Sequence, residues 1–241
     1  MSKSLNKDAK RRKRKFKDRL PNEVIVIKNE DKQSHEKWYK GRNIAAFPRP
    51  FRAILCSGVN SGKTNLVKNI LLRQKWDRIM LVPVDRRSKE WRDFDISDED
   101  IFDDIPPVSE FEHDNGKQAI ILEDYEAGTP SKQGNLSKLF RYVSTHCNVS
   151  VFLLYQDMMA VPKIARRISN IFVVWPMVDK RQTQIIGNRV GCEPGELEEL
   201  LDTFCKKSYD NICFDLTKES PYPLRLNIFQ PIHRAKTIKE D

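Results

Sequence analysis

The feature that most constrains the fold of this chain is the repeated alternation of short apolar runs with segments of helical periodicity. The apolar runs are nearly continuous, which is typical of strands buried on both faces. Parallel strands need helical crossovers, which cover both faces of the sheet. We therefore predict an α/β fold with a mostly parallel central sheet and helices on both faces. The expected strands are 23–28, 51–58, 78–84, 118–125, 149–156, 170–176, 211–216 and 223–229, and the expected helices are 63–74, 135–147, 161–169, 180–190 and 195–205.

The length of 241 residues is enough for one large α/β domain. We expect a basic disordered arm over residues 1–20 and a single domain over 21–241. The core of that domain would span about 45–180, followed by an extension of helices and a β-hairpin over 181–232. The acidic stretch 85–116 is loop-like, with weak helical turns.

Several classes of protein are disfavoured by composition. No run approaches the roughly 18 apolar residues that a membrane-spanning helix needs, so we expect no membrane span. The N-terminus carries cations but no apolar segment of a secretory signal. The five cysteines are widely spaced and form no CxxC pair, which favours reduced thiols in an intracellular compartment over a zinc site or a disulfide framework.

The positive charge is concentrated at the N-terminus. Residues 1–19 hold ten lysines and arginines against two aspartates, a balance of +8 out of a total of +9. Dense like charges repel one another and resist burial, so this arm is expected to stay disordered until it meets a polyanion. Binding to nucleic acid is the favoured interpretation, because it releases counterions from phosphates. A nuclear-import signal and a solubilising tail are the alternatives.

The stretch "ILCSGVNSGKTNLVKNILL", which begins at Ile54, resembles a phosphate-binding loop between a strand and a helix. Such a loop reads G-x-x-x-x-G-K-[ST], because its backbone N–H groups surround phosphate while Lys and Ser/Thr meet the phosphates and Mg²⁺. Gly62, Lys63 and Thr64 match, whereas Ser57 replaces the first glycine and Gly58 follows it. The alternative is a plain strand–turn–helix connection, but the flanking strand and helix favour a nucleotide site. The expected nucleotide contacts are Ser57, Gly58, Val59, Asn60, Ser61, Gly62, Lys63, Thr64 and Asn65.

An apolar strand ends in two adjacent carboxylates, Glu123 and Asp124, in the stretch "AIILEDYE". A P-loop enzyme needs one carboxylate on the Mg²⁺ shell and one that orients and deprotonates the attacking water. By position, Glu123 is the metal-side group, together with Thr64, and Asp124 is the water-side group. Most such strands end in Asp followed by Glu, so the division of roles stays open. Solvated acids at a strand end are the alternative.

Gln156 follows another apolar strand, "VFLLYQD". At that position a polar side chain can hydrogen-bond the γ-phosphate or the attacking water. An ordinary loop residue is the alternative, and the position of Gln156 after the other two motifs favours the functional interpretation.

Taken together, "SGVNSGKT", "AIILEDY", "FRYVSTHCNVSVFLLYQD" and "VPKIARRISNIFVVWP" resemble the poxvirus- and virophage-type DNA-packaging ATPases of the FtsK/HerA superfamily of P-loop ATPases. The resemblance covers roughly residues 45–180 and is most specific in the last two segments. These segments supply, in order, His146, Gln156, Pro162, Arg166 or Arg167, and Asn170. The sequence departs from the pattern at Ser57, Glu123 and Thr145.

The resemblance implies a homo-oligomeric ring that uses ATP and Mg²⁺ to move double-stranded DNA into a preformed capsid, in contact with portal or vertex proteins. It also implies an arginine that stabilises the transferring phosphoryl group, with Arg141 favoured for a role in trans and Arg166 or Arg167 for a sensor or interface role. Solvated helix residues are the alternative for all three. The implied location is a virus factory in the host cytoplasm, with the virion and, through the basic arm, the nucleus as alternatives.

Two other classes of function compete with a motor. A nucleotide kinase would need an arginine-rich lid, and no such cluster follows the fourth strand of the core beyond Arg166 and Arg167. A structural protein that binds nucleic acid through a degenerate P-loop would not need Lys63. Other nucleic-acid-dependent ATPases, including helicase-like translocases, share the same motifs.

Overall fold

The computed structural model describes residues 47, 49–86, 90–91, 94, 96–112, 116–217, 220 and 222–233. Its strands are β1 (Arg52–Cys56), β2 (Arg78–Val82), β3 (Gln118–Glu123), β4 (Val149–Tyr155), β5 (Ile171–Val174), β6 (Ile212–Asp215), β7 (Leu224–Leu226) and β8 (Gln230–Pro231). Its α-helices are α1 (Lys63–Arg73), α2 (Ser109–Glu112), α3 (Pro130–Lys138), α4 (Ser144–His146), α5 (Lys163–Ile168), α6 (Lys180–Val190) and α7 (Glu196–Phe204). A 3₁₀ turn, η2 (Asp98–Asp100), and a π-helical turn, η3 (Leu139–Val143), complete the described elements.

The strands form one eight-stranded sheet in the order β2-β3-β4-β1-β5-β6-β7-β8. Strands β1 to β5 are parallel, and β6, β7 and β8 add to one edge in antiparallel fashion. The predicted mostly parallel α/β sheet is therefore confirmed, and the two C-terminal runs do extend its edge as a hairpin. The short β8 was not predicted from the sequence.

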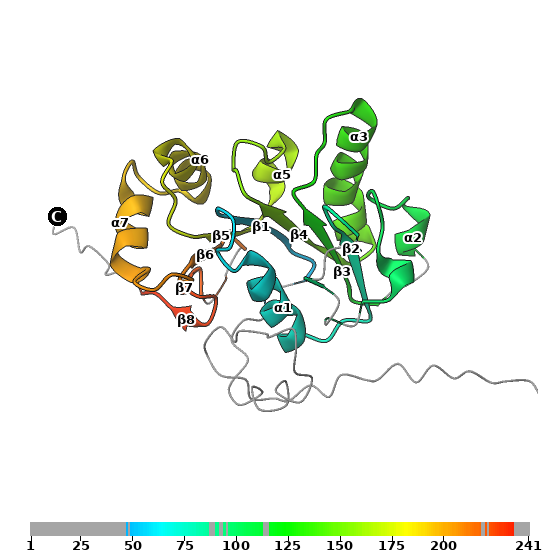
Figure 1. Ribbon diagram of the computed structural model, residues 1–241, viewed down its shortest axis with the longest axis horizontal. Coiled ribbons are helices and arrows are strands. Elements are labelled where there is room, and N and C mark those ends of the chain that lie inside the picture. The colour runs from blue at the N-terminus through cyan, green and yellow to red at the C-terminus, as the bar shows by residue number, and fades with distance from the viewer. Residues whose placement is uncertain are drawn as a thin grey trace, which may run out of the picture.

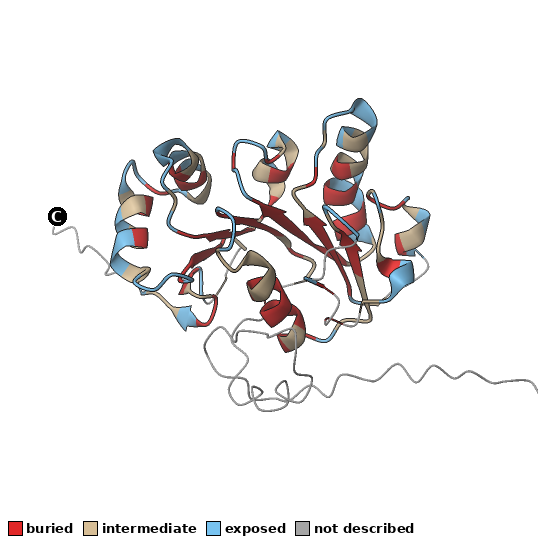
Figure 2. Cartoon of the chain, viewed as in Figure 1, coloured by how far each residue is buried: buried red, intermediate tan, exposed pale blue. Residues whose placement is uncertain are grey.

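Side chains alternate between two apolar layers along each central strand. In β1, Ala53 and Leu55 pack on the side of α1, whereas Ile54 and Cys56 pack on the opposite side. Figure 1 shows α1 against one face of the sheet and α3, α5 and α6 against the other. The strands are buried almost throughout, as Figure 2 shows, which explains why the sequence has continuous apolar runs rather than alternating ones.

Some helices begin at other residues than expected, because capping residues determine where a helix starts. The helix expected at 135 begins at Pro130, because the Thr129 hydroxyl accepts a hydrogen bond from Lys132 N at 3.3 Å and proline suits the first turn. Pro162 precedes α5 as its N-cap residue and does not lie within the helix. The strand expected at 23–28 and the basic arm lie outside the described residues.

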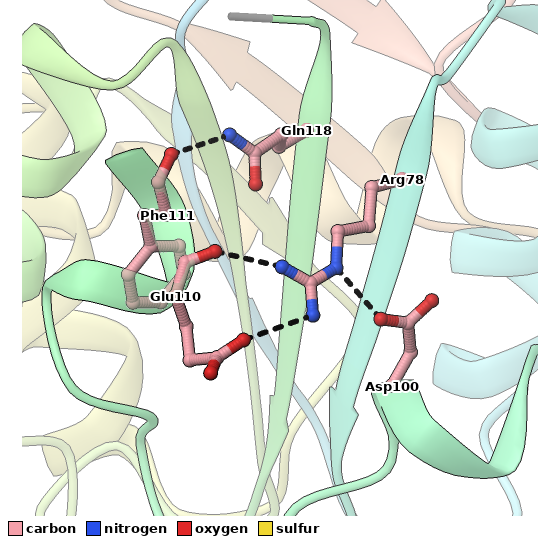
Figure 3. A network of polar contacts seen from close by, with 5 residues as sticks. All are labelled: Arg78, Asp100, Glu110, Phe111 and Gln118. Carbon is pink, nitrogen blue, oxygen red and sulfur yellow. Dashed lines mark hydrogen bonds and ion pairs between the residues drawn. The ribbon is translucent and has the colours of Figure 1, made fainter. Parts of the chain in front are cut away.

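The acidic stretch after β2 is held to the sheet by the side chain of Arg78 at the start of that strand (Figure 3). Its guanidinium donates to Asp100 Oδ1 at 2.7 Å and to the carbonyl and carboxylate of Glu110 at 2.7 and 3.4 Å. Beside it, the Gln118 amide donates to Phe111 O at 3.0 Å. These contacts attach η2 and α2 to the edge of the sheet, so the stretch expected to be loop-like contains two short ordered turns. None of the helices in the described ranges is long and apolar enough to cross a membrane.

Candidate nucleotide site

The loop between β1 and α1 lies at the centre of the sheet edge formed by the carboxyl ends of the parallel strands. Strand β1 lies between β4 and β5, and Ser57 N continues the ladder by donating to Tyr155 O at 3.1 Å. Gly62 has φ +91° at the N-cap of α1, a left-handed conformation that suits glycine. The first backbone N–H groups of α1 therefore open onto this edge, as in anion sites at helix N-termini.

The side chain of Lys63 folds back over this loop. Its ammonium donates to Ser57 O at 2.7 Å and to Gly58 O at 2.8 Å. Ser61 Oγ also donates to Gly58 O at 2.9 Å, and the Ser57 and Ser61 hydroxyls contact each other. Burial lowers the pKa of Lys63, while the charge of Asp124 acts in the opposite direction. The lysine thus occupies the concave side of the loop, where carbonyl oxygens are its partners.

The two carboxylates at the end of β3 have different partners. Glu123 Oε1 accepts a hydrogen bond from Trp91 Nε1 at 2.8 Å. Asp124 leaves the strand with φ +39° and accepts two hydrogen bonds from Gln156, from its backbone N–H at 3.0 Å and its side-chain amide at 2.8 Å. The three residues predicted separately from two strand ends therefore meet at one place, and Gln156 pairs with Asp124 rather than with Glu123.

Burial raises the pKa of Glu123 above the ordinary glutamate value of 4.5. The indole N–H of Trp91 opposes this effect by stabilising the carboxylate, whereas the nearby charges of Glu90 and Asp124 add to it. The negative charges of these three acids attract cations to this part of the site, although the described residues include no group of three ligands arranged to hold a metal ion.

Glu90 was not singled out from the sequence. Its carboxylate accepts a hydrogen bond from the Thr64 hydroxyl at 3.2 Å, and its carbonyl accepts one from the buried ammonium of Lys68. Neither Glu90 nor Trp91 lies in a motif, since both belong to the acidic stretch that follows β2. No periodicity or spacing in that stretch signals that it folds over the nucleotide loop.

A cavity of about 920 Å³ joins these groups. Seven loop and helix residues from Val59 to Asn65 line it, together with Glu123, Asp124 and Gln156, whereas Ser57 lies beneath it with 1% of its surface exposed. The opposite wall comes from residues that the sequence did not suggest: Trp175, Lys207, Tyr209, Asp210, Asn211 and Asn227. The volume of the cavity and the residues that line it are typical of small-molecule sites.

The predicted arginines lie at the other edge of the sheet. Asn170, three residues after Arg167, bonds Arg52 at the amino end of β1, and the Arg52 guanidinium donates to Phe140 O, next to Arg141, at 2.9 Å. Because α5 runs back from the carboxyl end of β4 to the amino end of β5, Arg166 and Arg167, near the end of this helix, lie toward the amino edge of the sheet and not at the carboxyl edge. The side chains of Arg141 and Arg167 are exposed there.

Two motif residues have structural partners at that amino edge. Asn170 Oδ1 accepts from Arg52 N at 2.8 Å and its amide donates to Thr217 at 2.9 Å, so this residue joins β1, β5 and the end of β6. His146 stacks on Tyr142 with ring centroids 4.8 Å apart. Neither residue reaches the cavity.

No protein-family model matches this sequence, and no curated protein sequence matches it either. Solved structures do share its fold. The genome packaging NTPase B204 from Sulfolobus turreted icosahedral virus 2 aligns in its complex with ATP-gammaS at TM-score 0.50 and 14% identity, over 76% of this chain and 98% of that one. Its AMPPCP complex aligns at TM-score 0.51 and 16% identity, over 78% and 100%.

B204 from Sulfolobus Turreted Icosahedral Virus, described as a DNA-packaging ATPase, aligns at TM-score 0.52 and 14% identity, over 78% of this chain and all of that one. At these identities the comparison establishes the fold. The P-loop ATPase fold implied by the sequence resemblance to packaging ATPases is thereby confirmed.

Proposed function

We propose that this protein is an ATPase that uses hydrolysis to move double-stranded viral DNA into a preformed capsid. The observation that carries the proposal is the cavity in which the loop lysine, Lys63, faces the Glu123–Asp124 pair and Gln156. The fold shared with B204, a genome packaging NTPase solved with ATP analogues, supports the same conclusion. A helicase-like translocase would share this site, so DNA packaging is the more specific part of the proposal.

The residues of the cavity suit Mg²⁺ with a nucleoside triphosphate. Mg²⁺ prefers oxygen ligands and is usually held by one or two carboxylates together with phosphates and water. Thr64 and Glu123 offer such oxygens on the same cavity. When bound, the ion would neutralise charge on the phosphates. The N–H groups of the loop from Gly58 to Asn65 would hold the phosphate chain, since Ser57 N already donates to Tyr155 O. The Lys63 ammonium would exchange the carbonyls of the loop for phosphate oxygens.

Asp124 is the general base of the proposed reaction. We propose that its carboxylate accepts a proton from the attacking water, while the Gln156 amide fixes the carboxylate and contacts the same water. The two hydrogen bonds between these residues support a joint role. Loss of a general base costs on the order of 10²- to 10⁴-fold in rate.

The position of the arginines supports an oligomer. Because Arg141 and Arg167 lie at the edge opposite the cavity, either can reach a phosphate only in the site of a neighbouring subunit. We propose that Arg141 acts in this way within a homo-oligomeric ring, and that Arg166 and Arg167 belong to the subunit interface. A finger supplied in trans would couple hydrolysis around the ring.

The remaining partners follow from the proposed motor. The basic arm would contact DNA phosphates, and capsid portal or vertex proteins would hold the ring. The protein would then act in the virus factory of the host cytoplasm, be present in the virion, or enter the nucleus through its basic arm.

ATP hydrolysis with and without double-stranded DNA tests this proposal. We expect Mg²⁺-dependent hydrolysis that DNA stimulates, and a loss of about 100-fold or more for Lys63→Ala and Asp124→Asn. Lys180→Ala is the matched control, because Lys180 is also the first residue of a helix but is exposed and does not line the cavity. Transfer of phosphate to a nucleoside without any effect of DNA would instead indicate a kinase. Normal DNA binding without turnover in the unaltered protein would indicate a structural role.

A further inference from the structure

The wall of the cavity opposite the acidic pair is made by the loop between α7 and β6. Lys207, Tyr209, Asp210 and Asn211 line the cavity from this loop, and Asn227 joins them from the end of β7. None of these residues has a part in the proposed chemistry. Asp210 and Asn211 are buried, whereas Tyr209 is an aromatic residue with 60% of its surface exposed. An exposed aromatic ring on the wall of a cavity is available to contact a bound ligand.

The backbone of this loop is fixed by buried groups. Tyr209 O accepts a hydrogen bond from the indole of Trp175, which is 2% exposed and follows β5, at 3.2 Å. Asp210 is 8% exposed, and its carboxylate accepts from Lys206 N and Lys207 N at 3.0 and 2.8 Å and from the Asn227 amide at 2.8 Å. The loop therefore presents the Tyr209 side chain from a rigid support.

The ring of Tyr209 lies beside the last glycine of the nucleotide loop. A Cβ atom built on Gly62 would be 3.4 Å from Tyr209 Cδ1, which is ordinary van der Waals contact. Tyr209 thus borders the N-terminus of α1, where the proposed phosphates would lie. This contact leaves more than half of the surface of Tyr209 exposed.

Strand order fixes which end of a nucleotide would meet Tyr209. The acidic pair and Gln156 follow β3 and β4, on one side of β1, whereas Tyr209 precedes β6, on the other side. A triphosphate on the β1–α1 loop with its terminal phosphate toward Asp124 must extend its nucleoside in the opposite direction, across β5 toward β6. Of the two aromatic residues that line the cavity on that side, Trp175 is buried and Tyr209 is exposed.

We propose that Tyr209 forms the nucleobase subsite of this protein by stacking its ring on the base of the bound nucleoside triphosphate. The inference rests on the proposed nucleotide site and adds the residue that recognises the base. Stacking is tolerant of base identity, because every base has a π face. The subsite therefore accepts both ATP and GTP, and the ring contributes affinity for the nucleoside rather than for the phosphates.

Calorimetric titrations of the full chain with ATP and with inorganic tripolyphosphate, both with Mg²⁺, test the proposal. For Tyr209→Ala we expect ATP to bind about 10- to 100-fold more weakly, with tripolyphosphate affinity unchanged, and we expect Tyr209→Phe to bind ATP as the unaltered protein does. Tyr142→Ala is the matched control, since Tyr142 is also an exposed tyrosine but lies at the amino edge of the sheet. This control should bind both ligands normally.

The outcomes separate the base subsite from the nucleotide site itself. If Tyr209→Ala weakens ATP and tripolyphosphate equally, the ring only shapes the loop, and the stacking proposal is overturned. Unchanged ATP affinity in Tyr209→Ala overturns it as well. If the unaltered protein binds neither ligand, the proposed nucleotide site fails and the subsite fails with it.

Discussion

At the scale of single residues, two adjacent carboxylates acquire different environments because Glu123 is the last residue of a strand and Asp124 follows it. Glu123 still belongs to β3 and meets the indole of Trp91, whereas Asp124 has left-handed backbone geometry and meets Gln156. The sequence placed both acids at the site but left their roles open. Under the proposed function, Asp124 with its partner Gln156 would lie beside the attacking water, and Glu123 would lie beside the metal ion.

Trp91→Phe tests the Glu123 environment through pH. Glu123 must be ionised to hold a cation, and burial raises its pKa above 4.5, so hydrolysis should fall as the pH drops through a value above 4.5. Removing the indole N–H deletes a contact that stabilises the carboxylate. The acid limb of the kcat/KM profile should therefore move to higher pH.

Trp76→Phe is the control for this pH profile, because the buried indole N–H of Trp76 has no hydrogen-bond partner among the described residues. Its acid limb should coincide with that of the unaltered protein, measured in the same buffers. If the acid limb of Trp91→Phe lies at the same pH as that of the unaltered protein, Trp91 does not affect the pKa of Glu123.

At the scale of secondary-structure elements, strands were easier to predict than the segments between them. Central strands such as β4 carry unbroken apolar runs because both faces are buried, and α6 has the bounds that its periodicity predicted. The segment that contains Glu90 and Trp91 and folds over the site has no such pattern. The loop that carries Tyr209 has none either. Their positions depend on long-range contacts, which a single sequence does not display.

The hairpin of β6 and β7 is fixed by a buried ion pair between Asp215 and Arg225, 2.8 Å apart with side chains 1% and 2% exposed. Asp215→Ala should lower the free energy of unfolding by about 3–5 kcal/mol, because it leaves a buried charge without its partner. Chemical denaturation measures this loss.

The control is Asp103→Ala, which removes an exposed ion pair with Arg86 and should lower the free energy of unfolding by less than about 1 kcal/mol. Equal losses would mean that the buried pair does not hold the hairpin.

At the scale of the whole molecule, the proposed catalytic groups lie at one edge of the sheet, and the arginines proposed for the role in trans and for the subunit interface lie at the opposite edge. The basic arm would add a third functional region under the proposal, and its ten cations contrast with the nearly neutral remainder of the chain. The strand–loop–helix motif was predictable because its residues are adjacent in sequence. The edge of the sheet on which Arg141 and Arg167 lie could be assigned only from the strand order in the structure.

Deletion of residues 2–19 tests the role of the arm. We expect weaker binding to double-stranded DNA and a shallower dependence of log K on log salt, because fewer counterions are released. Basal ATP hydrolysis should persist, since the cavity is built from other residues. Lys63→Ala, with its arm intact, should retain the full salt dependence. Equal DNA affinity with and without the arm at moderate salt would assign the arm to another role.

The most direct test of the central claim is an experimental structure of the protein with Mg²⁺ and a non-hydrolysable ATP analogue. The predicted result is a triphosphate on the loop from Ser57 to Thr64, with the Lys63 ammonium moved from the carbonyls of Ser57 and Gly58 to phosphate oxygens and with Glu123 and Asp124 facing the terminal phosphate. A nucleotide bound elsewhere, or carboxylates turned away from the terminal phosphate, would contradict the account.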